Sequence, residues 1–150
     1  MSKKFDLVVF GASGFTGRLV AEYLSNTAGK SHRLNWAMAG RDLMKLESVK
    51  KEMSISPATP LLQVNSSNEA SINKMVSKTN IVISTVGPYQ LYGNDLIKSC
   101  ISQGTDYVDL CGEPAWMSSV INSNENEAKK TGARIVFSCG FDSIPFDLGV

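Results

Sequence analysis

Three glycines near the start of the chain have the spacing of a phosphate-binding turn. They belong to a segment between an apolar run and residues at helical spacing, which consists of Gly11, Ala12, Ser13, Gly14, Phe15, Thr16 and Gly17. A dinucleotide pyrophosphate needs a tight strand-to-helix turn, accessible backbone N–H groups and the positive end of a helix dipole. We expect Gly11 to form the turn, Gly14 to allow close approach and Gly17 to let the helix pack tightly. The pattern is G-x-x-G-x-x-G rather than G-x-G-x-x-G, and an ordinary glycine-rich turn is the alternative.

The residues after the second predicted strand distinguish between the two nicotinamide dinucleotides. An NAD site places an acid about 20 residues beyond the glycine turn, where its carboxylate binds the ribose hydroxyls. Here that position carries Gly40 and Arg41, and the only acid between Gly17 and Arg41 is Glu22 on the first predicted helix. A guanidinium at this point pairs with the 2′-phosphate of NADP and stacks on adenine. The sequence therefore favours NADP over NAD. A solvated Arg41 or a ribose-binding Asp42 is the alternative.

A third candidate segment follows the clearest buried strand, residues 81–83. It consists of Val86, Gly87, Pro88 and Tyr89. Ligands of a doubly wound sheet bind beyond the carboxyl ends of its strands, so we expect this loop to lie opposite the glycine turn. Gly87 would then admit the middle of the cofactor, Pro88 would stiffen the loop and Tyr89 would face the nicotinamide. A plain turn is the alternative.

Catalytic residues do not emerge from the sequence. Short-chain reductases use a tyrosine with a lysine four residues later, and none of the 4 tyrosines has that partner. The single histidine, His32, falls in a polar loop. Glu113 and Asp142 are the acids nearest the predicted site, and each also suits a helix cap. Cys111 and Cys139 end apolar strands, so we expect both thiols to pack in the core.

Apolar runs alternate with helical segments along the whole chain. The predicted strands are residues 7–10, 34–39, 61–64, 81–83, 107–110 and 135–137. The predicted helices cover 15–24, 42–53 with Asp42 as its N-cap, 67–78, a segment around 96–101, and a polar helix that ends over 125–131 and is closed by Gly132. On the first helix the residues at helical spacing are Phe15, Leu19, Val20, Tyr23 and Leu24. This alternation predicts an α/β fold, a doubly wound parallel Rossmann-like sheet with helices on both faces, in three layers.

Composition restricts the class of partner. The 150 residues include 15 basic and 14 acidic residues, 43% are hydrophobic, and the net charge is +1. Such a chain is not a disordered tail, and it lacks the basic block that nucleic acid or an anionic membrane would attract. No apolar segment approaches the roughly 20 residues of a membrane-spanning helix. Three cysteines and one histidine form neither a disulfide framework nor a zinc site, which favours the cytoplasm and predicts no metal.

The motifs together resemble the N-terminal cofactor domain of the saccharopine dehydrogenase-like oxidoreductases. The matching segments are 9–17, 39–41, 86–89, 112–114 and 138–145. The resemblance implies a Rossmann domain binding NADP or NAD, followed by a substrate domain. The family contains enzymes acting on secondary amines between amino acids, relatives like enoyl reductases of lipid synthesis, and animal members associated with lipid droplets. Residues 112–114 and 141–145 look more like the lipid-linked members. The resemblance therefore implies the type of reaction, but it leaves open whether the substrate is derived from a lipid or from an amino acid.

Residues 1–150 are expected to form one dinucleotide-binding domain of a longer protein. Ser143 and Pro145 suit a helix start, yet Val150 follows after little more than one turn; a naturally short terminal helix is the alternative. The first hypothesis is an NADP-dependent oxidoreductase that delivers hydride to an unsaturated or imine bond held by a second domain, with this part inactive alone. The second is a non-catalytic nucleotide-sensing or scaffolding domain. The sequence leaves open the oligomeric state and any association of the longer protein with a membrane or lipid droplet.

Overall fold

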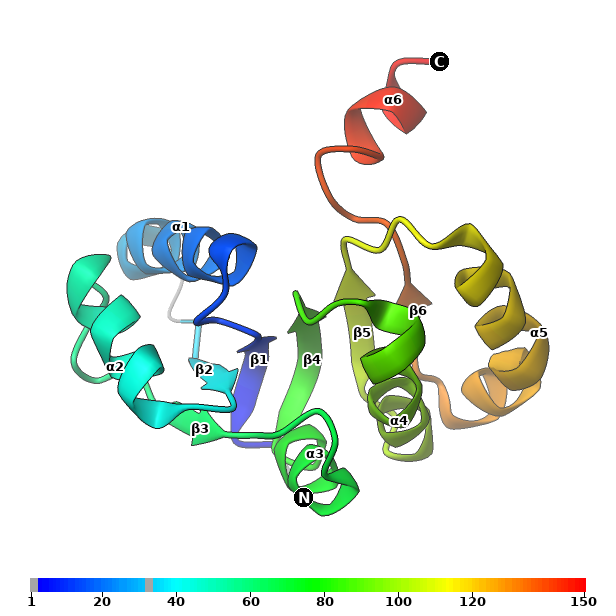
Figure 1. Cartoon of the computed structure of the whole chain (residues 1–150), viewed down its shortest axis with the longest axis horizontal. Helices are drawn as coiled ribbons and strands as arrows, with labels where there is room; N and C mark the ends of the chain where they lie inside the picture. The colour runs from blue at the N-terminus through cyan, green and yellow to red at the C-terminus, as the bar shows by residue number, and fades with distance from the viewer. Residues whose placement is uncertain (1–2, 32–33) are drawn as a thin grey trace.

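The fold is a single parallel sheet covered by helices on both faces (Figure 1). The computed structural model describes residues 3–31 and 34–150. The strands, in the spatial order β3-β2-β1-β4-β5-β6, are β1 (Phe5–Phe10), β2 (Trp36–Gly40), β3 (Leu61–Gln63), β4 (Thr79–Ser84), β5 (Asp106–Asp109) and β6 (Ile135–Val136). The helices are α1 (Phe15–Ser31), α2 (Leu43–Glu52), α3 (Glu69–Val76), α4 (Tyr89–Ser102), α5 (Pro114–Thr131) and α6 (Ile144–Leu148). The predicted doubly wound α/β fold is confirmed, and its strand order reverses between β1 and β4, where such sheets bind ligands.

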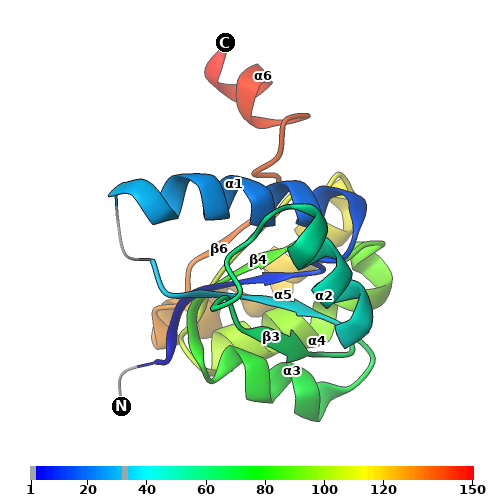
Figure 2. The same cartoon turned by 90° about the vertical axis from the view of Figure 1, so that its left-hand side faces the viewer.

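Two apolar cores lie on opposite faces of the sheet. In β1, Leu7 and Val9 pack toward α1 and α2, whereas Val8 and Phe10 belong to the core that contains residues of α3, α4 and α5. Successive side chains of a strand point to opposite faces, so an apolar run without alternation is what a strand buried on both sides requires. Figure 2 shows the resulting layers, with α1 on one side of the strands and α3 and α4 on the other.

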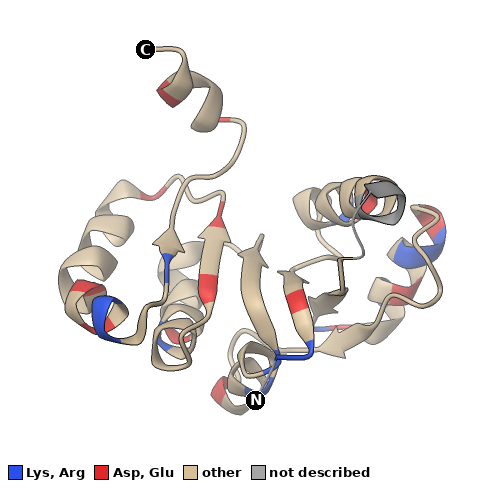
Figure 3. Cartoon of the chain, turned by 180° about the vertical axis from the view of Figure 1, so that it is seen from behind, with Lys and Arg blue, Asp and Glu red and all other residues tan. Residues whose placement is uncertain are grey.

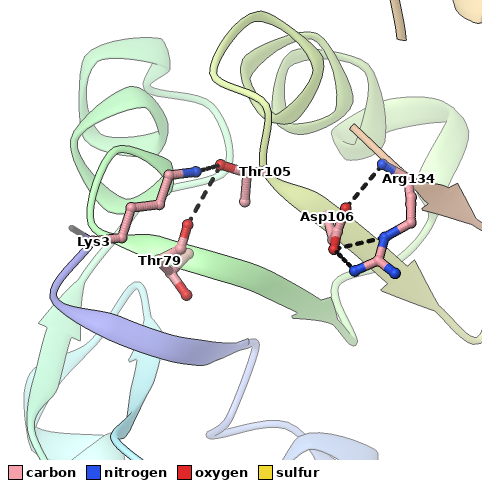
Figure 4. Close-up of polar contacts among 5 residues, drawn as sticks. All are labelled: Lys3, Thr79, Thr105, Asp106 and Arg134. Atoms are coloured by element: carbon pink, nitrogen blue, oxygen red, sulfur yellow. Dashed lines mark hydrogen bonds and ion pairs between the residues drawn. The ribbon is translucent and has the colours of Figure 1, made fainter. Parts of the chain in front are cut away.

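Polar side chains form hydrogen bonds at the amino edge of the sheet, where its parallel strands begin (Figure 4). Lys3 donates to the hydroxyl of Thr105, which in turn lies 3.4 Å from the carbonyl oxygen of Thr79. Arg134 donates to Asp106 through its backbone N–H at 2.9 Å and through Nε at 3.0 Å. The hydrogen bond from the Arg134 side chain holds the pKa of Asp106 below its usual range. These contacts tie β4, β5 and β6 together at the edge opposite to the glycine turn.

Helix α1 differs from the expectation in length and in the direction of its apolar side chains. Phe15, Leu19 and Tyr23 are 82%, 47% and 67% exposed. Ala21 is buried instead, with Val20 and Leu24 packed beside it. Small residues on the inner side, including the buried Gly17, bring the helix close to the sheet and turn the larger ones outward.

Helices α5 and α6 complete the carboxyl-terminal part. Helix α5 begins already at Pro114, well before the predicted polar segment, and ends at Gly132 in the left-handed conformation. Helix α6 begins at Ile144 as predicted, projects from the carboxyl edge and buries none of its residues. Figure 3 shows acidic and basic residues distributed over several elements. Among the residues described, no helix has the length and apolarity to span a membrane.

Candidate functional site

The glycine turn connects β1 to α1 at the carboxyl edge of the sheet. Gly11 has a φ of +89°, which favours glycine, and its N–H donates to the carbonyl oxygen of Ala39 at 2.9 Å. A Cβ atom at Gly11 would lie 2.6 Å from Oγ1 of Thr85. The loop after β4 therefore contacts the glycine turn, which confirms the predicted juxtaposition of the two segments. Ala12 has a buried side chain, so it can present only its backbone to a ligand.

Gly14 and Gly17 differ in what surrounds them. A Cβ atom at Gly17 would lie 2.1 Å from the carbonyl oxygen of Gly11, so α1 packs directly against the backbone of the turn. The same atom at Gly14 would meet only that carbonyl oxygen, at 3.3 Å, and Gly14 is exposed. Gly17 thus serves helix packing, whereas Gly14 leaves the outer surface of the turn open.

The first turn of α1 has free backbone donors. Within the described residues, no acceptor is bonded to the N–H groups of Ser13, Phe15 and Thr16, and the first turn contains no acid. Unpaired N–H groups at the positive end of a helix form an anion-binding site. The arrangement can therefore hold a phosphate group at the point where the ligand is expected.

A cavity of about 640 Å³ lies beside this turn and includes the predicted residue Arg41. Its lining consists of Ser13, Gly14, Arg41, Asp42, Leu43, Met44, Lys45 and Gln63. Oδ1 of Asp42 accepts the N–H groups of Met44 at 2.9 Å and of Lys45 at 3.1 Å, so the predicted N-cap of α2 is confirmed. This bonding favours the cap over the ribose ligand as the role of Asp42. Gly40, at the end of β2, is buried below the cavity, where a Cβ atom would lie 3.4 Å from Oγ of Ser13.

The cavity also contains Lys45, which sequence reasoning missed. Lys45 is exposed, and neither it nor Arg41 forms an ion pair with any described residue. It occupies the third position of α2, where a cation is disfavoured by the helix dipole and a glutamate would complete a capping box. That mismatch was readable in the sequence.

The loop after β4 is anchored to the end of β1. The N–H and Oγ1 of Thr85 both donate to the carbonyl oxygen of Phe10, at 2.9 and 3.0 Å. Val86 is half-buried, and Gly87 and Pro88 are exposed. This loop thus presents backbone at the open edge beside the glycine turn.

Tyr89 is placed differently from the expectation. Tyr89 is only 6% exposed, its hydroxyl donates to the carbonyl oxygen of Ser84 at 3.1 Å, and the centroid of its ring lies 5.7 Å from that of Trp116. Burial raises the pKa of this hydroxyl. The ring lies in the core because Trp116 of α5 covers it, so the expected orientation toward the nicotinamide is not observed.

Glu113 caps a helix other than its own. Its Oε1 accepts the N–H of Tyr89 at 2.8 Å and its Oε2 accepts the N–H of Gln90 at 2.9 Å, both in the first turn of α4. Glu113 directly precedes α5 but forms no side-chain cap there. The capping alternative is thus correct in kind, with a partner 24 residues away.

A buried carboxylate that the sequence did not single out joins the loops after β5 and β6. Asp109 accepts the Tyr107 hydroxyl at 2.8 Å, the Cys111 N–H at 3.0 Å and the Ser138 N–H at 2.9 Å. Burial raises the pKa of Asp109. The loops after β5 and β6 are therefore held together, below their exposed residues, by hydrogen bonds to this buried carboxylate.

The remaining candidates are two cysteines, Asp142 and His32. Cys111 is buried as predicted, but Cys139 is exposed, because Ser138 adopts a left-handed φ of +58° and turns the chain outward. Asp142 is exposed on the segment that leads to α6. His32 lies outside the described residues. Within those residues, no group of three or more His, Cys, Asp or Glu side chains could hold a metal ion.

Comparisons with known proteins agree with this geometry. The model of the saccharopine dehydrogenase NADP binding domain matches residues 7–136. The lipid droplet localized protein of Caenorhabditis elegans is 42% identical over 153 residues, covering 98% of this chain and 35% of the relative. A trans-acting enoyl reductase of Mycobacterium bovis is 40% identical over 149 residues, covering 99% of this chain and 35% of the relative.

A solved structure supports the fold. Apo saccharopine dehydrogenase (L-Glu forming) of Saccharomyces cerevisiae superposes with a TM-score of 0.71 at 20% identity, covering 92% of this chain and 28% of that chain. The chain spans about a third of the length of the curated relatives described above. It belongs to the saccharopine dehydrogenase family and matches the NADP-binding domain of that family.

Proposed function

We propose that this chain binds NADP(H) at the carboxyl edge of the sheet and orients it for hydride transfer in a longer oxidoreductase. The observation that carries the proposal is the first turn of α1, whose N–H groups have no acceptor among the described residues, beside a cavity with two cations, Arg41 and Lys45, that form no ion pair with those residues. Unpaired N–H groups suit a pyrophosphate, and a pair of cations suits an additional phosphate. NADP differs from NAD by such a phosphate on the adenosine ribose.

Three groups of residues would contact three different parts of the dinucleotide. The backbone of residues 11–16 would hold the pyrophosphate, with Gly17 allowing the helix to approach. Gly40 and Arg41 would border the adenosine, and Lys45 would add a second charge for the 2′-phosphate. Val86, Gly87 and Pro88 would pass beside the nicotinamide half through their backbone. Tyr89 would act only by fixing the start of α4, since its ring is buried.

The bound cofactor would supply a hydride, and this chain would orient the dinucleotide and shield it from water. We propose an unsaturated or imine bond as the acceptor, held by a second domain of the longer protein. Support comes from the relative named as an enoyl reductase and from exposed apolar side chains at the carboxyl edge, including Leu91, Phe141 and Ile144. The substrate would then be small and lipid-derived or amino-acid-derived. Residues 1–150 alone would bind the cofactor without turnover.

A second candidate is a non-catalytic nucleotide-sensing or scaffolding domain. It is favoured by the bonding of two carboxylates at the carboxyl edge, because Asp109 and Glu113 are both engaged with internal donors rather than free for proton transfer. The name of the lipid droplet relative supports lipid association of the longer protein. We propose a cytoplasmic location for either candidate.

Titration with NADPH and NADH tests the first step that both candidates share. We expect NADPH to bind more tightly than NADH, because only NADPH offers the phosphate for Arg41 and Lys45. Isothermal calorimetry on this chain measures both dissociation constants. Absence of binding for both dinucleotides would contradict the proposal, and equal affinity would contradict the 2′-phosphate assignment. Turnover by the full-length protein then separates the enzyme from the sensing domain.

A further inference from the structure

The first turn of α4 is held by a carboxylate from outside that helix. Both oxygens of Glu113 are used, one for the N–H of Tyr89 and one for the N–H of Gln90, at 2.8 and 2.9 Å. Pro88, at the N-cap position, supplies no side-chain acceptor. Glu113 is therefore the side chain that satisfies the start of α4 and neutralises the positive end of its dipole.

The segment fixed in this way borders the proposed nicotinamide half of the site. Residues 85–88 connect β4 to α4, and at their other end Thr85 is bonded twice to Phe10. Gly87 and Pro88 between these anchors are exposed. The position of their backbone thus depends on the bonds of Thr85 and on those of Glu113.

Glu113 is itself held in place by hydrogen bonds of the loop after β5 and by the packing of α5. Its N–H donates to Sγ of Cys111 at 3.3 Å, and the N–H of Cys111 donates to the buried carboxylate of Asp109 at 3.0 Å. The ring of Trp116, one turn into α5, packs on Tyr89. The carboxylate is consequently presented to α4 by a packed and hydrogen-bonded framework rather than by a free loop.

Resting on the proposed function, we infer that Glu113 is a positioning residue for the nicotinamide half of NADP(H). Its two hydrogen bonds set the position of the 85–88 backbone against which that half lies. Its charge also repels phosphate from the N-terminus of α4, so the pyrophosphate is directed to the open N-terminus of α1. The cavity of Arg41, which we propose for the adenosine half, is lined by neither Glu113 nor residues 85–88.

The two halves of the cofactor give a direct test. Glu113→Gln keeps the shape but replaces one acceptor oxygen with an NH₂ group that faces a backbone donor. We expect this variant to bind NADPH about tenfold more weakly than the wild type, since charge-assisted bonds are lost. Its affinity for 2′,5′-ADP, which lacks the nicotinamide half, should stay within about twofold. Glu127→Gln, an exposed acid on α5 that is paired with Lys130, is the matched control and should change neither affinity.

Each outcome decides the assignment. Unchanged NADPH affinity, or an equal loss for NADPH and 2′,5′-ADP, would overturn it, because a merely structural role would affect both ligands alike. If wild-type protein binds neither ligand, the proposed function fails as well. Circular dichroism checks folding. If Glu113→Gln does not fold, Glu113→Asp is measured instead, because its shorter side chain cannot reach both amides and should show the same selective loss.

Discussion

Helices α1 and α4 begin at the same edge of the sheet, after the neighbouring strands β1 and β4, but their first turns are occupied differently. Neither helix has an acid in its own first turn. In α4 the amides of Tyr89 and Gln90 are bonded to Glu113, whereas in α1 the amides of Phe15 and Thr16 have no acceptor among the described residues. The fold supplies several positive helix ends, and side chains from elsewhere decide which one stays available to a phosphate.

The start of α2 is a third case. Its cap is satisfied by Asp42, yet Arg41 and Lys45 surround it with positive charge. The helix start is thus already capped, and it still lies beside two cations that have no ion-pair partner among the described residues. This turn therefore suits a peripheral phosphate held by side chains, whereas the α1 turn suits one held by backbone.

Removal of the close packing under α1 should have the largest effect. Gly17→Ala places a Cβ atom 2.1 Å from a backbone oxygen, so the helix must move away from the turn. We expect the free energy of unfolding to fall by about 3 kcal/mol, together with dinucleotide binding. Chemical denaturation measures the change. A loss below about 1 kcal/mol would show that α1 is not held by this contact.

An acid placed at the start of α1 should occupy its free N–H groups, as Glu113 occupies those of α4. Gly14→Asp places a carboxylate at the N-cap, as Asp42 does for α2, and the Cβ atom meets only one oxygen at 3.3 Å. We expect NADPH affinity to fall about 100-fold with stability kept or raised, because the amides are occupied and the phosphates repelled. Gly14→Asn, a neutral cap of the same size, should lose less. Binding by the aspartate variant within about threefold of the wild type would contradict an open α1 site.

Removal of the cations at α2 should act on only one dinucleotide. Arg41→Ala should weaken NADPH binding about tenfold and leave NADH binding within about twofold, because only NADPH carries the 2′-phosphate. Lys45→Ala should have a smaller effect of the same kind, about threefold, as its ammonium is exposed. Calorimetry with both dinucleotides gives the comparison. Equal losses for NADPH and NADH would refute the assignment of this cavity to the 2′-phosphate.

The amino edge provides the smallest effect and a control for the others. Because the folded-state pKa of Asp106 is lowered by Arg134, the stability it contributes is present above its unfolded pKa and is lost as pH falls through the folded pKa. Asp106→Asn should lower the thermal midpoint at pH 7 by about 1–3 °C. Thermal melts should show this difference vanish in acid, with NADPH affinity unchanged. A change in NADPH affinity would mean that the two edges are coupled.

The sequence predicted the parts of the site that depend on local signals. The glycine turn, the cap of α2 by Asp42 and the left-handed Gly132 each arise from residues within a few positions of one another. The predicted alternation of strands and helices likewise follows from local periodicity, and right-handed crossovers then predict a doubly wound sheet. The strand order itself comes from the structure, because doubly wound sheets occur in more than one order.

The features that the sequence could not predict depend on distant partners. Tyr89 is buried because Trp116 lies on it, and Glu113 caps a helix that begins 24 residues earlier. Asp109 accepts the N–H of Ser138, which lies 29 residues later in the chain. Helical spacing on α1 could not distinguish the inner Val20 from the outer Phe15, since the small Gly17 and Ala21 decide which side approaches the sheet.

Amide chemical shifts on addition of NADPH test the central claim most directly. A proton–nitrogen correlation spectrum of this chain reports on the backbone N–H groups of both helix starts at once. We predict large shifts for Ser13, Phe15 and Thr16 and small ones for Tyr89 and Gln90, whose amides stay bonded to Glu113. Large shifts at Tyr89 and Gln90 with none at the start of α1 would contradict the account.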